Sequence, residues 1–150
     1  MIEIKVDNFS ENELSVKMQD NGYIYDIYPD FSMFMNIQNH YSTYSDMNDD
    51  NSTTLHIASN DTVIIPTMLH FHLPDGYTII GTVNEKLAEE GLAININYGK
   101  FVSYENGNLG IVAYNTSRSP IQVSSNEPIV SISVIKQEQI KLLKNENSES

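Results

Sequence analysis

The 150-residue sequence contains no cysteine, which excludes disulfides, thiolate catalysis and cysteine-bound zinc. Tryptophan is also absent, whereas tyrosine is common, with nine residues. No apolar run approaches the length of about 18 residues that a transmembrane helix requires, so we expect no membrane span. The first residues lack a basic start followed by an apolar stretch, so we expect no secretory signal.

Basic residues are scarce: 8 Lys and Arg stand against 20 Asp and Glu, and the formal net charge is −12. An acidic surface repels phosphate groups, so we expect neither a nucleic-acid partner nor binding to an acidic membrane. Solubility is the favoured explanation of this charge. Mimicry of DNA is less favoured, because the acidic residues are scattered along the sequence rather than arrayed.

Short alternating or apolar runs separated by turn residues predict an all-β fold in a single domain over residues 1–150. The polar stretch 44–51 predicts a loop, and 136–144 predicts one or two helical turns before a frayed end at 145–150. The expected strands are 2–6, 23–28, 55–57, 63–65, 69–73, 77–82, 92–97, 101–104, 109–114, 121–123 and 129–135.

One short helix is predicted in the middle of the chain. Asn84 can cap a helix over residues 85–90, and Gly91 suits the left-handed position just past its end. The pair Asn106-Gly107 lies between two apolar runs, a pattern typical of a tight β-hairpin.

Several short segments occur in an order that resembles the dUTPase and dCTP deaminase superfamily, most clearly over residues 63–135. The resemblance implies a jelly-roll-type β-barrel with one short helix, assembled as a homotrimer with three active sites at subunit interfaces. The matching segments are Ile65-Pro66-Thr67, Leu73-Pro74-Asp75-Gly76-Tyr77, Leu87-Ala88-Glu89-Glu90-Gly91, Gly107 to Asn115, Pro120 to Val123 and Ile129 to Ile132.

The residues that the family uses for dUTP hydrolysis are replaced. Asn84-Glu85-Lys86 stands where the family has Arg-Ser-Gly, and Val102 stands where an Asp orients the attacking water. A carboxylate repels phosphate, and valine cannot act as a general base. Asn126-Glu127-Pro128 replaces a Gly-Asp-Arg turn, and residues 136–150 lack the glycines of the family's C-terminal arm.

We therefore predict no catalytic residue. If a nucleotide site persists, its candidate residues are Asp26, Asn84, Glu85 and Tyr104. The segment Tyr25-Asp26-Ile27 resembles the family's first motif, where an Asp helps hold Mg²⁺ through water. A deaminase would need an Arg and a Glu at the base, and the only Glu candidates, Glu89 and Glu90, fall in the predicted helix.

The leading hypothesis is a non-catalytic dUTPase-fold trimer that serves as a structural or interaction protein. The Asn- and Tyr-rich composition suits a phage protein, in capsid decoration or at a fibre base, with capsid or other virion proteins as partners. Its expected location is the virion or the cytoplasm of the infected host, and no cofactor is expected. The alternatives are a protein that binds or sequesters nucleotides and a divergent, active dUTP nucleotidohydrolase that uses Mg²⁺.

Two further clusters have metal-ligand chemistry. His70 and His72 alternate on a strand and thus share one face, but a structural zinc site needs about four ligands, so a solvated or interface face is favoured. Asp46, Asp49 and Asp50 lack the spacing and glycine of a known calcium loop, so a solvated acidic loop is favoured there.

Overall fold

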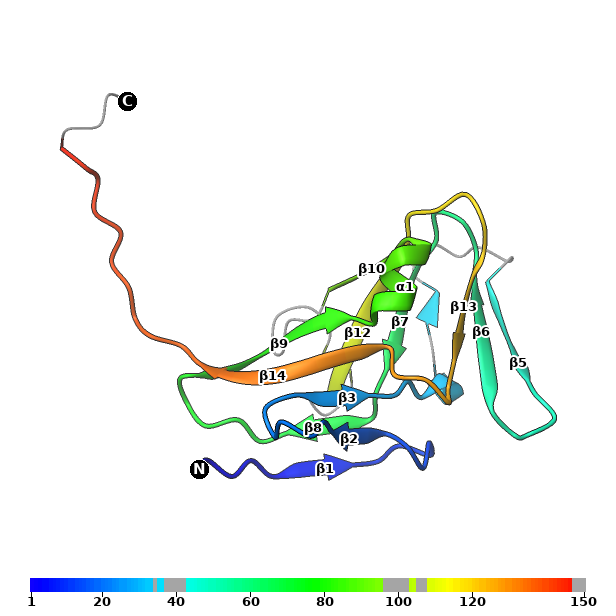
Figure 1. The fold of residues 1–150 in the computed structure, drawn as a ribbon, viewed down its shortest axis with the longest axis horizontal. Coiled ribbons are helices and arrows are strands. Elements are labelled where there is room, and N and C mark those ends of the chain that lie inside the picture. The colour runs from blue at the N-terminus through cyan, green and yellow to red at the C-terminus, as the bar shows by residue number, and fades with distance from the viewer. Residues whose placement is uncertain (34, 37–42, 96–102, 105–107, 147–150) are drawn as a thin grey trace.

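The computed structural model describes residues 1–33, 35–36, 43–95, 103–104 and 108–146, and its strands form four antiparallel sheets (Figure 1). The first contains, in order, β2 (Val16–Met18), β3 (Tyr25–Ile27), β14 (Val130–Lys136) and β9 (Tyr77–Val83). The second contains β10 (Leu92–Asn95), β12 (Asn108–Asn115), β7 (Thr62–Pro66) and β4 (Met35–Asn36), with β11 (Ser103–Tyr104) also on β12. The third contains β13 (Ile121–Ser124), β6 (Thr53–Ile57) and β5 (Tyr44–Met47), and the fourth pairs β1 (Val6–Asn8) with β8 (Leu69–Phe71).

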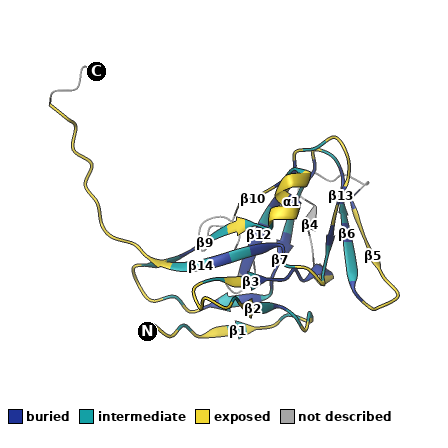
Figure 2. Ribbon diagram, in the orientation of Figure 1, coloured by how far each residue is buried: buried dark blue, intermediate teal, exposed yellow. Residues whose placement is uncertain are grey.

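The core lies between these sheets and follows from alternation along each strand. Val63 and Ile65 on β7 lie beside Ala113 and Ile111 on β12, and all four side chains are fully buried. Figure 2 shows buried positions along β7, β12 and β14, whereas β1, β5 and α1 are largely exposed. Burial of one face of each strand is the expected result of a period-two pattern.

The predicted helix is confirmed as α1 (Glu85–Glu90). The Asn84 side chain accepts a hydrogen bond from the Lys86 N–H, and Gly91 has a left-handed φ of 106°. A Cβ at Gly91 would lie 3.1 Å from the Ser117 Cβ and 3.2 Å from the Thr116 Oγ1. Both the positive φ and this close approach require glycine at the position.

The prediction of a loop over residues 44–51 is wrong in its first half. Tyr44–Met47 forms β5, which pairs with β6 in the register Tyr44↔His56 to Met47↔Thr53. The Tyr44 ring stacks on His56 at a centroid distance of 4.5 Å, and Asn51 takes a positive φ of 67° in the turn. All four residues of β5 are exposed, so the strand has no apolar alternation that would reveal it.

Two other predicted elements differ from the structure. The first strand lies at Val6–Asn8 rather than at 2–6, because pairing with β8 sets its position. No helix forms over residues 136–144; β14 runs to Lys136, and the segment 137–146 then projects away from the body (Figure 1). A helix of one or two turns is marginal in water without packing contacts, and this segment is exposed.

The other predicted strands are confirmed to within a few residues. The predicted turn Glu105-Asn106-Gly107 lies outside the described residues, as do 96–97 and 101–102 of two predicted strands and the frayed end at 147–150. The strands β11 and β12 on either side of that turn pair antiparallel. Within the part of the chain that is described, no helix is long and apolar enough to cross a membrane.

Candidate functional site

Asp26 lies in a polar row on the outward face of the first sheet. Its partners in register are Lys17 on β2 and Ser131 on β14, and Ser131 is in turn opposite Thr82 on β9. Directly opposite residues of an antiparallel sheet project to the same face. The apolar neighbours Ile27 on β3 and Val130 and Ile132 on β14 are buried and face the core instead.

The Asp26 carboxylate is held by two hydrogen bonds. Its Oδ1 accepts from the Gln19 Nε2 at 2.8 Å and from the Ser131 Oγ at 2.7 Å. Burial raises the pKa of the nearby Tyr28, and the negative charge of Asp26 raises it further. The Lys17 ammonium lies 5.6 Å from the centre of the Tyr28 ring. The Asp26 carboxylate is thus oriented by Gln19, just past β2, and by Ser131 on β14.

Helix α1 begins beside this polar row. The N-terminus of the helix is capped by the side chain of Asn84. The Asn84 Oδ1 accepts from the Lys86 N–H at 3.0 Å, and Glu85 adds a negative charge in the first turn. The first N–H groups of a helix are the groups that commonly bind phosphate. Here one of them is already capped, and a carboxylate stands next to them.

The turn at residues 126–128 lies against the same helix end. The Asn84 N–H donates to the Ile129 carbonyl oxygen at 2.9 Å, which ties the end of β9 to the start of β14. The Lys86 Nζ lies 3.9 Å from the Glu127 Oε2, and both side chains are exposed. The structure therefore brings Asp26, Asn84 and Glu85 to one end of the first sheet, with Glu127 close by.

Tyr104 is separate from these residues in the chain. It pairs with Asn108 at the end of β11, in the sheet of β7 and β12 rather than that of β3 and β9. Val102, which the resemblance aligns with the family's water-orienting Asp, lies outside the described residues. Within a single chain, Tyr104 thus lies in a different sheet from Asp26 and from β9, the strand that leads into Asn84 and Glu85.

Comparison with solved structures settles the fold. The chain superposes on the native EIAV dUTPase with a TM-score of 0.62 at 16% identity, over 98% of this chain and 100% of the other. The fold is dUTPase-like. A mutant dUTPase from phage phi11 of S. aureus matches with a TM-score of 0.63 at 16% identity, over 99% of this chain and 100% of that one. The Staphylococcus bacteriophage 80alpha dUTPase matches with a TM-score of 0.63 at 16% identity, over 99% of both chains. No protein-family model and no curated protein matches the sequence.

The dUTPase-like fold confirms the predicted architecture of an all-β body with one short helix. The phi11 structure is described as revealing the coordination of a structural Mg(II) ion. In this chain, the described residues contain no group of three or more His, Cys, Asp or Glu side chains that could hold a metal ion. Among the described residues, Asp26 therefore has no further metal ligands assembled beside it. A role for Mg²⁺ belongs only to the alternative hypothesis of an active dUTP nucleotidohydrolase.

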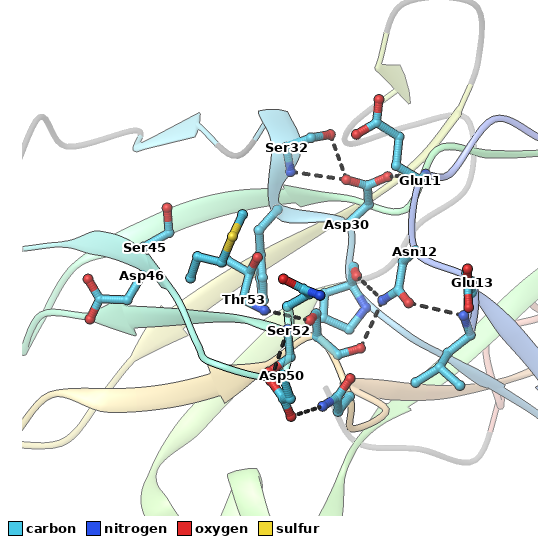
Figure 3. A pocket seen from close by; sticks show the side chains of 17 residues that line it. Glu11, Asn12, Glu13, Asp30, Ser32, Ser45, Asp46, Asp50, Ser52 and Thr53 are labelled. Atoms are coloured by element: carbon cyan, nitrogen blue, oxygen red, sulfur yellow. Dashed lines mark hydrogen bonds between the residues drawn. The ribbon is translucent and has the colours of Figure 1, made fainter.

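A second region of this dUTPase-like body was missed by sequence reasoning. A pocket of about 830 Å³ lies between the N-terminal segment, the β5–β6 hairpin and the turn after β13 (Figure 3). Its lining includes five carboxylates and no Lys, Arg or His: Glu11, Glu13, Asp30, Asp46 and Asp50. The residues come from four separate stretches of sequence, so no local motif signals the pocket.

Two of the five carboxylates, those of Asp30 and Asp50, hold parts of the pocket wall together by hydrogen bonds. The Asp30 carboxylate accepts from the Ser32 N–H and Oγ on one oxygen and from the Ser10 Oγ and the Glu11 N–H on the other. Asp50 accepts from the Ser52 Oγ and N–H, and these bonds hold the pKa of Asp50 below its usual value. Of the predicted acidic loop, Asp46 therefore lies on β5, and Asp49 and Asp50 lie in the hairpin turn.

Proposed function

We propose that the chain is a non-catalytic dUTPase-fold protein that assembles as a homotrimer and acts by binding a protein partner. The observation that carries the proposal is the N-terminus of α1. There Asn84 caps the helix and Glu85 places a carboxylate at the position where the resemblance puts a phosphate-binding motif. A triphosphate would have to displace the cap and approach a like charge.

The C-terminal segment supports self-association. Residues 137–146 lead away from the body in extended form and expose Ile140, Leu142 and Leu143 by 80%, 88% and 78% (Figure 1). Apolar side chains that remain this exposed commonly mark surfaces that another chain covers. The location of Tyr104 in a different sheet also fits a site shared between subunits rather than one complete within a single chain.

The phage dUTPases supply the analogy for the partner. The Staphylococcus bacteriophage 80alpha dUTPase is described as controlling the transfer of virulence genes by a proto-oncogenic G protein-like mechanism. We extend to this chain the idea of a dUTPase fold with a role beyond hydrolysis, and we place its partner among capsid or other virion proteins. Its location under this proposal is the virion or the cytoplasm of the infected host.

Loss of the nucleotide site predicts that nucleotides do not stabilise the fold. Thermal unfolding with dUTP, dUMP or dCTP, each with and without Mg²⁺, should show no shift, and dUTP should release no pyrophosphate. A ligand at about a hundred times its dissociation constant would add roughly 2.7 kcal/mol and be plainly visible. Turnover of dUTP that disappears in Glu85→Gln but persists in Glu89→Gln would establish the enzyme alternative instead.

The C-terminal segment predicts the assembly state. Light scattering should give three subunit masses for the full chain and one for a chain that ends at Lys136. The triple variant Ile140→Ser, Leu142→Ser and Leu143→Ser should also be monomeric, because it keeps the length but removes the apolar side chains. Lys141→Ser is the matched control and should remain a trimer. A full-length monomer at micromolar concentration would contradict the homotrimer.

A further inference from the structure

Two histidines and an aspartate lie together on the outward face of the β1–β8 pair, away from the region of Asp26 and Asn84. Asp7 on β1 is directly opposite His70 on β8. His72 continues the ladder, since its N–H donates to the Lys5 carbonyl oxygen at 2.9 Å. The Phe71 side chain between the two histidines is 5% exposed and faces the core, so His70 and His72 share the outward face.

The two imidazole rings are close enough to share one ion. Their centroids are 4.6 Å apart, with an angle of 51° between the ring planes. Two imidazoles that each bind an ion at about 2.1 Å have centroids roughly 5 Å apart. The strand backbone holds both Cα atoms in place, so a small change of side-chain torsion suffices to bring one nitrogen of each ring to a common ion.

Asp7 prepares one of these rings for a metal. The His72 Nε2 lies 2.6 Å from the Asp7 Oδ2, and the His72 and Asp7 side chains are 46% and 33% exposed. A carboxylate at Nε2 holds the proton on that nitrogen and leaves the lone pair on Nδ1. A histidine that binds a metal through one nitrogen commonly donates from the other to a carboxylate in this way.

We propose that His70 and His72 bind one divalent transition-metal ion, Cu²⁺ or Zn²⁺, with Asp7 as the hydrogen-bond partner that orients His72. Two imidazole nitrogens suit these ions, and Cu²⁺ should bind more tightly than Zn²⁺. The described residues contain no ready group of three ligating side chains, so water completes the coordination and the ion exchanges freely. The hard ion Mg²⁺ prefers oxygen ligands and should not bind there.

The charges around the site are mixed. Asp7 is the carboxylate that contacts it, and Lys5, just before β1, is the nearby cation. The hydrogen bond with His72 lowers the pKa of Asp7, desolvation opposes this effect, and the charges of His72, Lys5 and His70 lower the pKa further.

Calorimetric titration of the full chain with Cu²⁺, Zn²⁺ or Mg²⁺ tests the site. We expect one Cu²⁺ per chain at these histidines, weaker Zn²⁺ and no Mg²⁺. His70→Gln and His72→Gln should each weaken Cu²⁺ binding at least tenfold, and Asp7→Asn should weaken it by about ten- to a hundredfold. His56→Gln is the matched control, since His56 also contacts a carboxylate, that of Asp46 at 3.0 Å, and has no second described histidine beside it. Unchanged Cu²⁺ binding in the double variant His70→Gln, His72→Gln would overturn the proposal.

Hydrogen exchange locates the bound ion independently. With Zn²⁺, protection should increase at residues 5–8 and 69–72, because an ion on His72 strengthens its bond to Asp7 and so holds β1 on β8. The double variant should show no such increase. Circular dichroism confirms that each variant is folded before it is titrated. Protection that appears only elsewhere in the chain would also overturn the proposal.

Discussion

Asn115→Ala should lower the free energy of unfolding by about 3 kcal/mol. The Asn115 side chain is fully buried at the end of β12. Its Nδ2 donates to the Ile57 carbonyl oxygen at 2.9 Å and to the Ser119 carbonyl oxygen at 2.8 Å. Its Oδ1 accepts from the Ser117 N–H and Oγ at 2.9 and 2.8 Å. Alanine would leave the buried Ile57 carbonyl and the partly buried groups of Ser117 and Ser119 without this partner.

Urea unfolding measures this loss, with the slope of the free energy against urea expected to stay unchanged. Asn115→Leu separates the hydrogen bonds from the lost volume, because leucine fills the space but makes no hydrogen bond. It should be destabilised to a similar extent. Asn95→Ala, at an exposed asparagine on the neighbouring strand β10, is the control and should change stability by less than about 0.5 kcal/mol. A loss under about 1 kcal/mol in Asn115→Ala would refute the anchoring role.

Asp30→Asn should destabilise the protein by about 3 kcal/mol at pH 7. The Asp30 side chain accepts four hydrogen bonds and connects the N-terminal segment at Ser10 and Glu11 to the 3-10 turn Phe31–Met33. An amide at this position presents N–H groups to neighbours that are themselves donors. Urea unfolding measures this loss of stability. Asp20→Asn, at an exposed aspartate, is the matched control.

The effect of Asp30→Asn should depend on pH. Burial raises the pKa of Asp30, but the hydrogen bonds from Ser32, Glu11 and Ser10 outweigh burial and hold it below the usual value. A lowered folded-state pKa stabilises the protein above the unfolded-state value of about 4, and this contribution is lost as the pH falls through the folded-state pKa. The difference in the free energy of unfolding between the unchanged protein and Asp30→Asn should therefore become smaller below about pH 4. A gap that stays constant down to pH 2 would contradict this role.

Elements whose signal is local could be predicted from the sequence. The bounds of α1 follow from Asn84 and Gly91, because capping depends on a few adjacent residues. Strand β7 follows from its compact apolar run and the proline that closes it. By contrast, β5 is exposed at all four positions and is held by pairing with β6 and by the turn at Asn51. Neither feature produces an apolar pattern in the sequence.

The candidate site could be predicted only in part. Asp26, Asn84 and Glu85 were identified by resemblance, and they lie at the same end of the first sheet because β14 pairs with both β3 and β9. That arrangement depends on pairings between distant strands, which periodicity does not reveal. The acidic pocket was missed for the same reason. Its walls come from residues 11–14 and 29–32, from the β5–β6 hairpin at 45–47 and 50–53, and from 125–126.

The projecting C-terminal segment has a consequence for the lifetime of the chain in a cell. Proteases bind extended, accessible backbone, and residues 137–146 offer it together with Lys141 and Lys144, while the body presents paired strands. Under the homotrimer proposal, a subunit that finds its partners covers this segment, whereas one that does not leaves it open to cleavage. Cleavage there removes the side chains needed for assembly, so an unassembled subunit that is cleaved can no longer form a trimer. The number of intact chains would therefore follow the number that have assembled.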